Sequence, residues 1–328
     1  MKMSRMASFW LGLAAAALMT GAPSGRAAAQ AYPERNIRLI VPFPPGGLND
    51  TVARLLAPHL EKALGKTIII DNRPAAAGIV GTDAVVRAEP DGYSLLMVAS
   101  SHTVAPAVNS KLPYNTENDL AAIALVSRNP LLFVVNSKVA AKTVGEFIAL
   151  AKAEPGKLNY ATVGPGSQSH LITELFAQRA GIKMQHVPYR GGNPAVMAMV
   201  TGDTQFAVLS PQVSMPQMEA GALRAIAVGS KARDPKFPQV PAMAESGFAD
   251  FEAIQWVGLL TTRGTPPAII ARLNAEVNAA LKNPDLVAKL AQQGMTPAGG
   301  TPDEFQKLIS TEVKQWTEVA KAANITAE

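Results

Sequence analysis

Short apolar runs alternate with longer amphipathic stretches along most of this chain, and this alternation restricts the fold more than any other feature. An apolar run bounded by turn residues predicts a buried strand, whereas an apolar stripe with a period of about 3.6 residues predicts a helix. Strands are predicted at 37–41, 68–71, 95–99, 123–127, 131–135, 159–161, 205–209 and 225–228. Helices are predicted from 49 or 50 towards 64 and at 144–153, 169–180, 195–200, 267–282 and 302–323. The alternation indicates an α/β fold with mostly parallel sheets.

Local signals set the expected ends of these helices. Asn49 or Asp50 is expected to cap the first helix, and Pro58 is expected to kink or interrupt it. Glycine tolerates the left-handed conformation that ends many helices, so a glycine after a helical stretch predicts a stop. Four glycines stand at such places: Gly65, Gly181, Gly202 and Gly221.

The first residues have the pattern of a secretory signal peptide. Lys2 and Arg5 precede an apolar run over 9–19, and a small-residue stretch follows. The run is too short to span a bilayer. Cleavage is expected after Ala29 or Ala31, with residues 1–31 as the removed segment, so we expect export to the periplasm.

Composition excludes several classes of partner and site. Removing residues 1–31 takes away Lys2, Arg5 and Arg26, so 30 basic residues against 25 acidic ones become 27 against 25. No basic stripe with interleaved aromatic residues marks nucleic-acid binding, and neither nucleic acid nor lipid headgroups are expected as partners. The sequence has no cysteine, which excludes disulfides and thiolate metal sites. A hydrophobic content of 48% allows two packed lobes.

The chain has no low-complexity linker, so two lobes would be joined by segments that cross between them. The expected crossings lie around Arg128-Asn129-Pro130 and Ile254-Gln255-Trp256. One lobe would then be discontinuous and interrupted by the other. We predict a first lobe made of residues 32–130 and 255–328 and a second lobe made of residues 131–254.

Loops that follow strands and open helices are the places to look for a ligand, because helix N-termini present unpaired backbone N–H groups and a partial positive charge. The loop over 43–50 has two adjacent glycines stiffened by prolines. The loop over 164–170 is rich in glycine and serine, so it predicts an anion site. Ser167 or Ser169 acting only as a helix cap explains that loop equally well.

Three further strand ends carry small or polar residues. The loop Tyr189-Arg190-Gly191-Gly192-Asn193-Pro194 opens a helix, and its arginine is expected to face solvent more often than ligand. Ser100-Ser101-His102 and Ser210 follow two other strands. Together the five loops predict one polar crevice.

The same loop residues allow a competing hypothesis, that the protein is an enzyme. Ser167 or Ser169 beside His170 suggests a serine hydrolase, but no Gly-x-Ser-x-Gly turn is present and adjacent helix residues do not face one another. The four histidines, His59, His102, His170 and His186, have no metal-ligand spacing. We therefore expect no catalytic residues, no metal and no cofactor, and His170 remains the histidine of most interest.

Taken in order, these motifs resemble those of the periplasmic receptors of tripartite tricarboxylate transporters, the TctC-like or Bug family. The resemblance covers essentially the whole chain after residue 31. It rests on Tyr32-Pro33, Ile40-Val41-Pro42-Phe43-Pro44-Pro45-Gly46-Gly47, Asp50, Ala53-Arg54, Asp71-Asn72-Arg73-Pro74, Ala88-Glu89-Pro90-Asp91-Gly92-Tyr93, Leu112-Pro113-Tyr114, Gly164 to His170 and Val187-Pro188-Tyr189-Arg190-Gly191.

The resemblance implies a bilobed periplasmic binding protein, type II-like, with two mixed or parallel sheets and a ligand cleft between the lobes. The implied ligand is a di- or tricarboxylate, an acidic amino acid or an aromatic acid. The first lobe would contribute Phe43, Pro44, Gly46, Gly47, Ala77, Gly78, Ser100 and Ser101, and the second Ser167, Ser169, His170, Tyr189, Gly191 and Ser210. Ala75, Ala76 and Ala77 stand where relatives tend to have glycines, and Leu48-Asn49 and Val208-Leu209-Ser210 also depart from the family pattern.

The resemblance also implies the partners. We expect a monomer that delivers its ligand to the permease subunits of a transporter, or alternatively presents the ligand to a membrane sensor. An exported serine hydrolase is the third possibility. Sequence does not separate transport from sensing, because both use the same closed form.

Overall fold

The structure is a computed structural model that describes residues 32–75 and 78–326. All described elements lie in one compact unit, Pro33–Glu328. Within the described residues the strands form two mixed sheets, one of six strands and one of five. The α/β class predicted from the sequence pattern is confirmed. The predicted signal peptide and its cleavage site fall outside the described residues.

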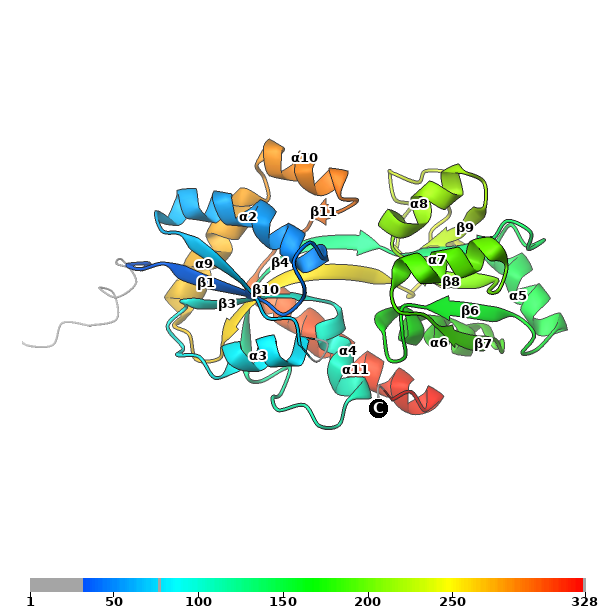
Figure 1. Ribbon diagram of the computed structural model, residues 1–328, viewed down its shortest axis with the longest axis horizontal. Helices are drawn as coiled ribbons and strands as arrows, with labels where there is room; N and C mark the ends of the chain where they lie inside the picture. The colour runs from blue at the N-terminus through cyan, green and yellow to red at the C-terminus, as the bar shows by residue number, and fades with distance from the viewer. Residues whose placement is uncertain (1–31, 76–77, 327–328) are drawn as a thin grey trace, which may run out of the picture. The chain divides into compact units, whose positions relative to one another are not determined.

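The six-stranded sheet is built from both ends of the chain. Its strand order is β11 (Thr296–Pro297), β4 (Leu120–Pro130), β10 (Ile254–Thr262), β3 (Ser94–Ala99), β1 (Ile37–Val41) and β2 (Ile68–Asn72). β1 pairs in parallel with β2 and β3, whereas β10 runs antiparallel to both β3 and β4. Helices α2 (Leu48–Leu64), α9 (Pro267–Ala280) and α10 (Pro284–Gln292) gather on one side, and α3 (Ile79–Val86), α4 (Ser101–Val108) and α11 (Pro302–Ala323) on the other (Figure 1).

The five-stranded sheet comes from the middle of the chain. Its order is β7 (Gln185–Pro188), β6 (Asn159–Thr162), β8 (Phe206–Leu209), β5 (Leu132–Asn136) and β9 (Leu223–Val228). β6 is parallel to β7 and β8, and β5 is antiparallel to β8 and β9. One face packs against α5 (Val144–Ala153) and α6 (Gln168–Ala180), and the other against α7 (Gly192–Thr201) and α8 (Pro211–Glu219).

The segments that link the two sheets run side by side. Ile254 of β10 pairs with Pro130 at the end of β4, and the pairing continues antiparallel to Arg128. Beyond it, the Leu131 amide donates to the Ala253 carbonyl, and the Gly229 amide to the Leu131 carbonyl, both at 2.8 Å. These are the two regions expected to be crossings. The assignment of two separate lobes remains a prediction.

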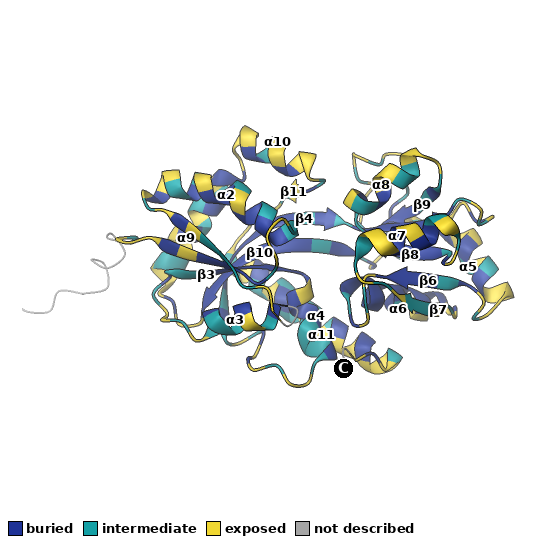
Figure 2. Cartoon of the chain, viewed as in Figure 1, coloured by how far each residue is buried: buried dark blue, intermediate teal, exposed yellow. Residues whose placement is uncertain are grey.

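Buried apolar side chains form cores on the sheet faces (Figure 2). Helix α11 contributes to two of them. Its Phe305 and Ile309 belong to the core of the six-stranded sheet, whereas Trp316, Val319 and Ala320 pack with phenylalanines of the five-stranded sheet. The C-terminal helix therefore ties both sheets together, although sequence reasoning assigned it to the first lobe alone.

Several local expectations were wrong. Helix α2 begins at Leu48 with Gly47 as its N-cap, two residues before Asn49 and three before Asp50, and it continues through Pro58, so the expected interruption is absent. The sheets are mixed, which the family resemblance allowed, and not mostly parallel as the alternation alone indicated, because β5 and β10 each pair antiparallel with both neighbours. Gly65, Gly181 and Gly202 end helices in the left-handed conformation as expected.

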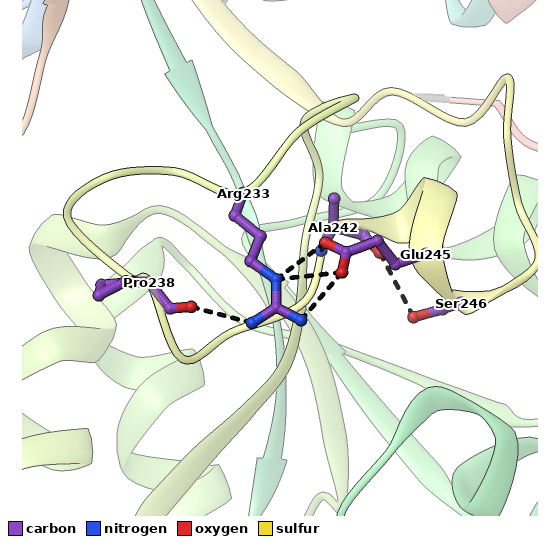
Figure 3. A network of polar contacts seen from close by, with 5 residues as sticks. All are labelled: Arg233, Pro238, Ala242, Glu245 and Ser246. Atoms are coloured by element: carbon purple, nitrogen blue, oxygen red, sulfur yellow. Dashed lines mark hydrogen bonds and ion pairs between the residues drawn. The ribbon is translucent and has the colours of Figure 1, made fainter.

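The long segment between β9 and β10 is held by a polar network (Figure 3). The Arg233 guanidinium donates to both carboxylate oxygens of Glu245, at 2.9–3.1 Å, and to the Pro238 carbonyl at 3.0 Å. Glu245 also accepts the Ala242 amide at 3.0 Å, which holds the pKa of that carboxyl below its usual range together with Arg233. The network fixes a loop that carries the chain back to the crossing strand β10.

Candidate functional site

The loop between β1 and α2 contains the predicted ligand residues Phe43, Pro44, Gly46 and Gly47, and it is held in place by Asp50. Asp50 is 2% exposed, and its Oδ2 accepts the Gly46 amide at 2.8 Å and the Arg54 guanidinium at 2.9 Å. Asn72, at the end of β2, donates to Asp50 Oδ1 and to the Phe43 carbonyl. The side chains of Asp50 and Asn72 thus fix the backbone of this loop through hydrogen bonds. Pro44 and Gly46 of the same loop stay exposed.

The next two helix starts in the six-stranded sheet bring Gly78, Ser100 and Ser101 into position. Gly78 is the N-cap of α3 with φ +96°, a conformation that residues with a β-carbon rarely adopt. Ala77 lies outside the described residues. Ser100 is the buried N-cap of α4, and Ser101, the first residue of that helix, is exposed.

The loop before α6 is tied by its own serines. Ser167 Oγ donates to the Gly164 carbonyl at 2.7 Å and accepts the His170 amide at 3.4 Å, so Ser167 caps the helix. Ser169 Oγ accepts the Val163 amide at 3.2 Å and lies 3.1 Å from Ser167 Oγ. Ser167 therefore acts as a helix cap, which was one of the two roles that the sequence left open. Binding of a ligand by the Ser167 and Ser169 hydroxyls remains a prediction.

Two histidines stack beneath this loop. The His170 and His186 ring centroids are 3.8 Å apart, and the Tyr160 ring lies near both, 5.0 Å from His186 and 6.2 Å from His170. His170 Nδ1 accepts the Gly166 amide, and His186 Nε2 lies 2.7 Å from Thr162 Oγ1. Burial, with a contribution from His186, lowers the pKa of His170 to about 4, and burial also lowers the pKa of His186. Both rings are neutral at neutral pH.

The remaining predicted residues lie at other helix starts of the five-stranded sheet. Gly191 is the N-cap of α7 with φ +109°, and Ser210 is the N-cap of α8 without a side-chain cap bond. Tyr189 precedes α7 and is half-buried, and burial and Asp203 raise the pKa of its phenol. Arg190 is exposed, as the sequence predicted.

One contact joins a predicted residue beside the six-stranded sheet to the start of α6 beside the five-stranded sheet. Ser100 Oγ donates to Gln168 Oε1 at 2.7 Å, and Gln168 Nε2 donates to the Ile254 carbonyl at 2.8 Å. The Ser100 amide donates to the Trp256 carbonyl. The starts of α4 and α6 are therefore fixed to each other and to β10. Sequence reasoning missed Gln168, and its only sequence signal is a polar residue directly after a glycine- and serine-rich turn.

A second grouping lies within the six-stranded sheet. Phe43, Gly78 and Ser101 border one small pocket of about 10 Å³, which is room for about one water molecule. His102 and Tyr114 also border it. Three residues predicted from separate loops thus face one space.

Within the part of the chain that the structure describes, no group of three or more histidine, aspartate or glutamate residues is placed to hold a metal ion. Among these same residues, no helix combines the length and apolar character needed to cross a membrane.

The sequence is similar to that of known proteins. Residues 52–325 match the model of the tripartite tricarboxylate transporter family receptor, TctC. Protein BugT of Bordetella pertussis is 38% identical over 295 residues, which cover 89% of this chain and 90% of BugT.

Solved structures show the same likeness. An R. palustris protein solved with adipate has a TM-score of 0.75 and 31% identity, covering 90% of this chain and 99% of that one. MatC of Rhodopseudomonas palustris, solved with bound malate, has a TM-score of 0.72 and 32% identity, covering 88% of this chain and 99% of MatC.

Proposed function

The chain belongs to the tripartite tricarboxylate transporter receptor family, and from this premise we propose that it captures a small carboxylate in the periplasm and delivers it to the membrane subunits of a transporter. The observation that carries the proposal is that two solved relatives, at 31% and 32% identity, contain adipate and malate. In this proposal the protein acts as a monomer, with a first lobe of residues 32–130 and 255–328 and a second of residues 131–254.

The helix starts supply the chemistry that a carboxylate needs. α4 follows β3 of one sheet, α6 follows β6 of the other, and the Ser100–Gln168 hydrogen bond joins the N-cap of α4 to the first residue of α6. Helix N-termini present backbone N–H donors and a partial positive charge, so two of them in contact favour an anion more than one does. In our proposal the carboxylate is held by these amides and by nearby hydroxyls, without a buried arginine.

The contacts of Ser167 and His170 disfavour the hydrolase alternative. A serine nucleophile needs a base that takes its proton. Ser167 Oγ instead donates to the Gly164 carbonyl, and His170 Nδ1 already accepts the Gly166 amide. These groups stabilise the turn before α6, which is a binding-loop role.

A thermal-shift and calorimetry panel tests the proposal. The protein lacking residues 1–31 is titrated with mono-, di- and tricarboxylates and with the uncharged amide of each acid. An acid at about 100 times its dissociation constant should add roughly 2.7 kcal/mol of stability, whereas its amide should add none. If no acid raises the melting temperature while another class of solute does, the carboxylate proposal is wrong.

A pair of serine variants makes the test specific to the site. Ser101 and Ser110 are both exposed serines on or just after α4, but only Ser101 lies at its N-terminus. We expect Ser101→Ala to weaken binding of the acid by about tenfold, the loss of roughly one hydrogen bond. Ser110→Ala should leave affinity unchanged, and equal effects would contradict a site at the start of α4.

A further inference from the structure

A carboxyl group lies on the buried side of helix α11. The buried residues of this helix are Phe305, Ile309, Trp316, Val319 and Ala320. Glu312 follows Ile309 by three residues and precedes Trp316 by four, so it lies on the same face of the helix. A charge on that face is unfavourable unless it is paired, so the contacts of Glu312 decide its form.

The Glu312 carboxyl group contacts two buried side chains from other elements. Its Oε2 lies 2.7 Å from Thr103 Oγ1 of α4, and its two oxygens lie 2.9 and 3.0 Å from Trp256 Nε1 of β10. Both partners also contact Ser100. Thr103 Oγ1 lies 2.8 Å from the Ser100 carbonyl oxygen, and the Ser100 amide donates to the Trp256 carbonyl at 3.0 Å. Glu312 therefore acts, through two residues, on the N-cap of α4.

The number of hydrogen atoms decides which of these groups donates. The Thr103 hydroxyl has one hydrogen, but its oxygen lies within bonding distance of two acceptors, the Ser100 carbonyl and Glu312 Oε2. If Glu312 is ionised, the hydroxyl serves only one of them. If Glu312 is protonated, its O–H donates to Thr103 Oγ1, the Thr103 hydroxyl donates to Ser100, and Trp256 donates to the other carboxyl oxygen. Only the protonated form gives each contact its own hydrogen.

The surroundings of Glu312 also favour the protonated form. Burial raises the pKa of its carboxyl to about 7, although its hydrogen bonds and Arg128 act in the opposite direction. Arg128 of β4 is also ion-paired with Glu252, at 3.7 Å. On α4, burial lowers the pKa of His102 to about 4, so that ring stays neutral, and β10 contains no ionisable residue.

We propose that Glu312 positions the start of α4 in its protonated form, so that the protein binds its carboxylate ligand more tightly when this proton is present. The inference rests on the proposed function, in which the start of α4 contacts the ligand. When the proton leaves to solvent, the Thr103 hydroxyl turns from the Ser100 carbonyl to the carboxylate, and the N-cap loses a hydrogen bond. Glu312 is a positioning residue that acts through Thr103 and Trp256.

Infrared difference spectroscopy tests the protonation without a ligand. A neutral carboxylic acid has a carbonyl band that an ionised carboxylate lacks. The difference between wild type and Glu312→Gln should contain this band at pH 6 and lose it with a midpoint at about pH 7. The matched control, Glu318→Gln, removes an exposed carboxylate from the same helix and should show only the ionised form. An ionised Glu312 at pH 6 overturns the inference.

Calorimetry tests the effect on binding, with the tightest-binding acid of the panel described above. We expect wild type to bind about tenfold more weakly at pH 8 than at pH 6, the loss of roughly one hydrogen bond. Glu312→Gln should bind equally well at both, because its amide donates to Thr103 and accepts from Trp256 at any pH. Glu318→Gln should keep the wild-type change, so titration of the acid itself cancels in the comparison.

Variants of Thr103 test the hydrogen-bond chain and serve if Glu312→Gln fails to fold. Thr103→Ser keeps the hydroxyl and should keep the pH dependence. Thr103→Val keeps the shape without the hydroxyl, so it should bind about tenfold more weakly than wild type at pH 6 and show no further loss at pH 8.

The outcomes separate this inference from the proposed function. If wild type and Glu312→Gln show the same change of affinity with pH, the positioning role is overturned and carboxylate capture stands. If no acid of the panel binds at either pH, carboxylate capture is overturned, and the role of Glu312 in binding falls with it.

Discussion

At the scale of single residues, Asp50 does the most to shape the first ligand loop. Burial alone would raise the pKa of its carboxyl, but hydrogen bonds from Arg54, Gly46 and Asn72 outweigh burial and hold that pKa below its usual range. The carboxylate is therefore ionised at neutral pH, and it fixes the Gly46 amide and, through Asn72, the Phe43 carbonyl.

We predict that Asp50→Asn destabilises the fold and weakens ligand binding. An asparagine keeps the shape but loses the charge, and it cannot accept from all the present donors, so unfolding in urea should show a loss of about 2 kcal/mol. Calorimetry should show affinity reduced by about tenfold as the loop loosens. Asp285→Asn, which also removes an i,i+4 ion pair but on exposed α10, should cost much less, and a similar cost would contradict the loop role.

Because His170 is buried as a neutral ring, we predict that the free energy of unfolding decreases as the pH is lowered. Because the pKa of His170 in the folded protein is about 4, below the ordinary value of 6.5, the unfolded chain takes up a proton first as pH falls. The stability from the neutral ring is complete above about pH 6.5 and is lost progressively down to about pH 4. The expected loss over this range is about 3 kcal/mol, of which about 2 kcal/mol is lost between pH 6.5 and pH 5.

Urea unfolding at pH 7 and pH 5 checks this. His170→Asn should lose less stability between the two pH values than wild type does, because the titrating ring is gone. His102 contributes in the same direction, so His102→Leu with His170→Asn should be flatter still. Glu312 acts oppositely, because burial raises its pKa to about 7, so only differences between variants are diagnostic. An unchanged slope in both variants would contradict the prediction.

At the scale of elements, the segment crossing between the sheets depends on a glycine. A β-carbon on Gly229 would lie 2.5 Å from the Ala253 β-carbon and 2.5 Å from its carbonyl oxygen, much closer than real contacts. The backbones approach this closely because Gly229 bonds to both Leu131 and Ala253.

We predict that Gly229→Ala destabilises the protein by about 1–3 kcal/mol, since the crossing segments must separate to admit the methyl group. Gly145→Ala makes the same change in α5, where nothing lies within 4 Å, and should stabilise by about 0.5–1 kcal/mol. Urea unfolding of both variants provides the comparison. Equal effects would mean that the crossing is not tightly packed.

Helix α11 shows how an element acts beyond its own sheet. Glu312, midway along it, lies 2.7 Å from Thr103 Oγ1 of α4 and accepts hydrogen bonds from Trp256 of β10 at 2.9–3.0 Å. The helix thus holds the start of α4 and the crossing strand together. Its amphipathic pattern predicted its bounds correctly, but periodicity within one helix carries no information about which sheet each turn contacts.

At the scale of the whole molecule, we predict that a bound ligand makes the protein more compact. In our proposal the carboxylate contacts the start of α4 beside one sheet and the start of α6 beside the other. Binding therefore favours the conformation in which both helix starts contact the ligand at once. Small-angle scattering should give a smaller radius of gyration at saturating ligand than without ligand. An unchanged radius at saturation, verified by calorimetry on the same sample, would contradict two lobes that close.

The sequence by itself determined the α/β class and most helices and strands, because burial of alternating apolar runs is a local requirement that leaves a local pattern. It placed α5 and α11 correctly, but it named no strand at β7, β10 or β11 and no helix at α3, α4, α8 or α10. β7 is a short strand with exposed or half-buried residues, and α8 contains an internal proline and polar residues that weaken the pattern. α10 has an apolar pair, Leu286 and Leu290, but is only 9 residues long.

Only the tertiary structure decided which residues meet. The Ser100–Gln168 bond, the His170–His186 stack and the pocket around His102 each join residues from different segments, and a sequence pattern does not encode distances between segments. Tertiary structure likewise decided the antiparallel pairing of β5 and β10, since strand direction depends on how the chain crosses between sheets. Sequence located the loops that could bind an anion, and packing decided which of their atoms are already paired and which, like His102 Nε2, have no partner among the described residues.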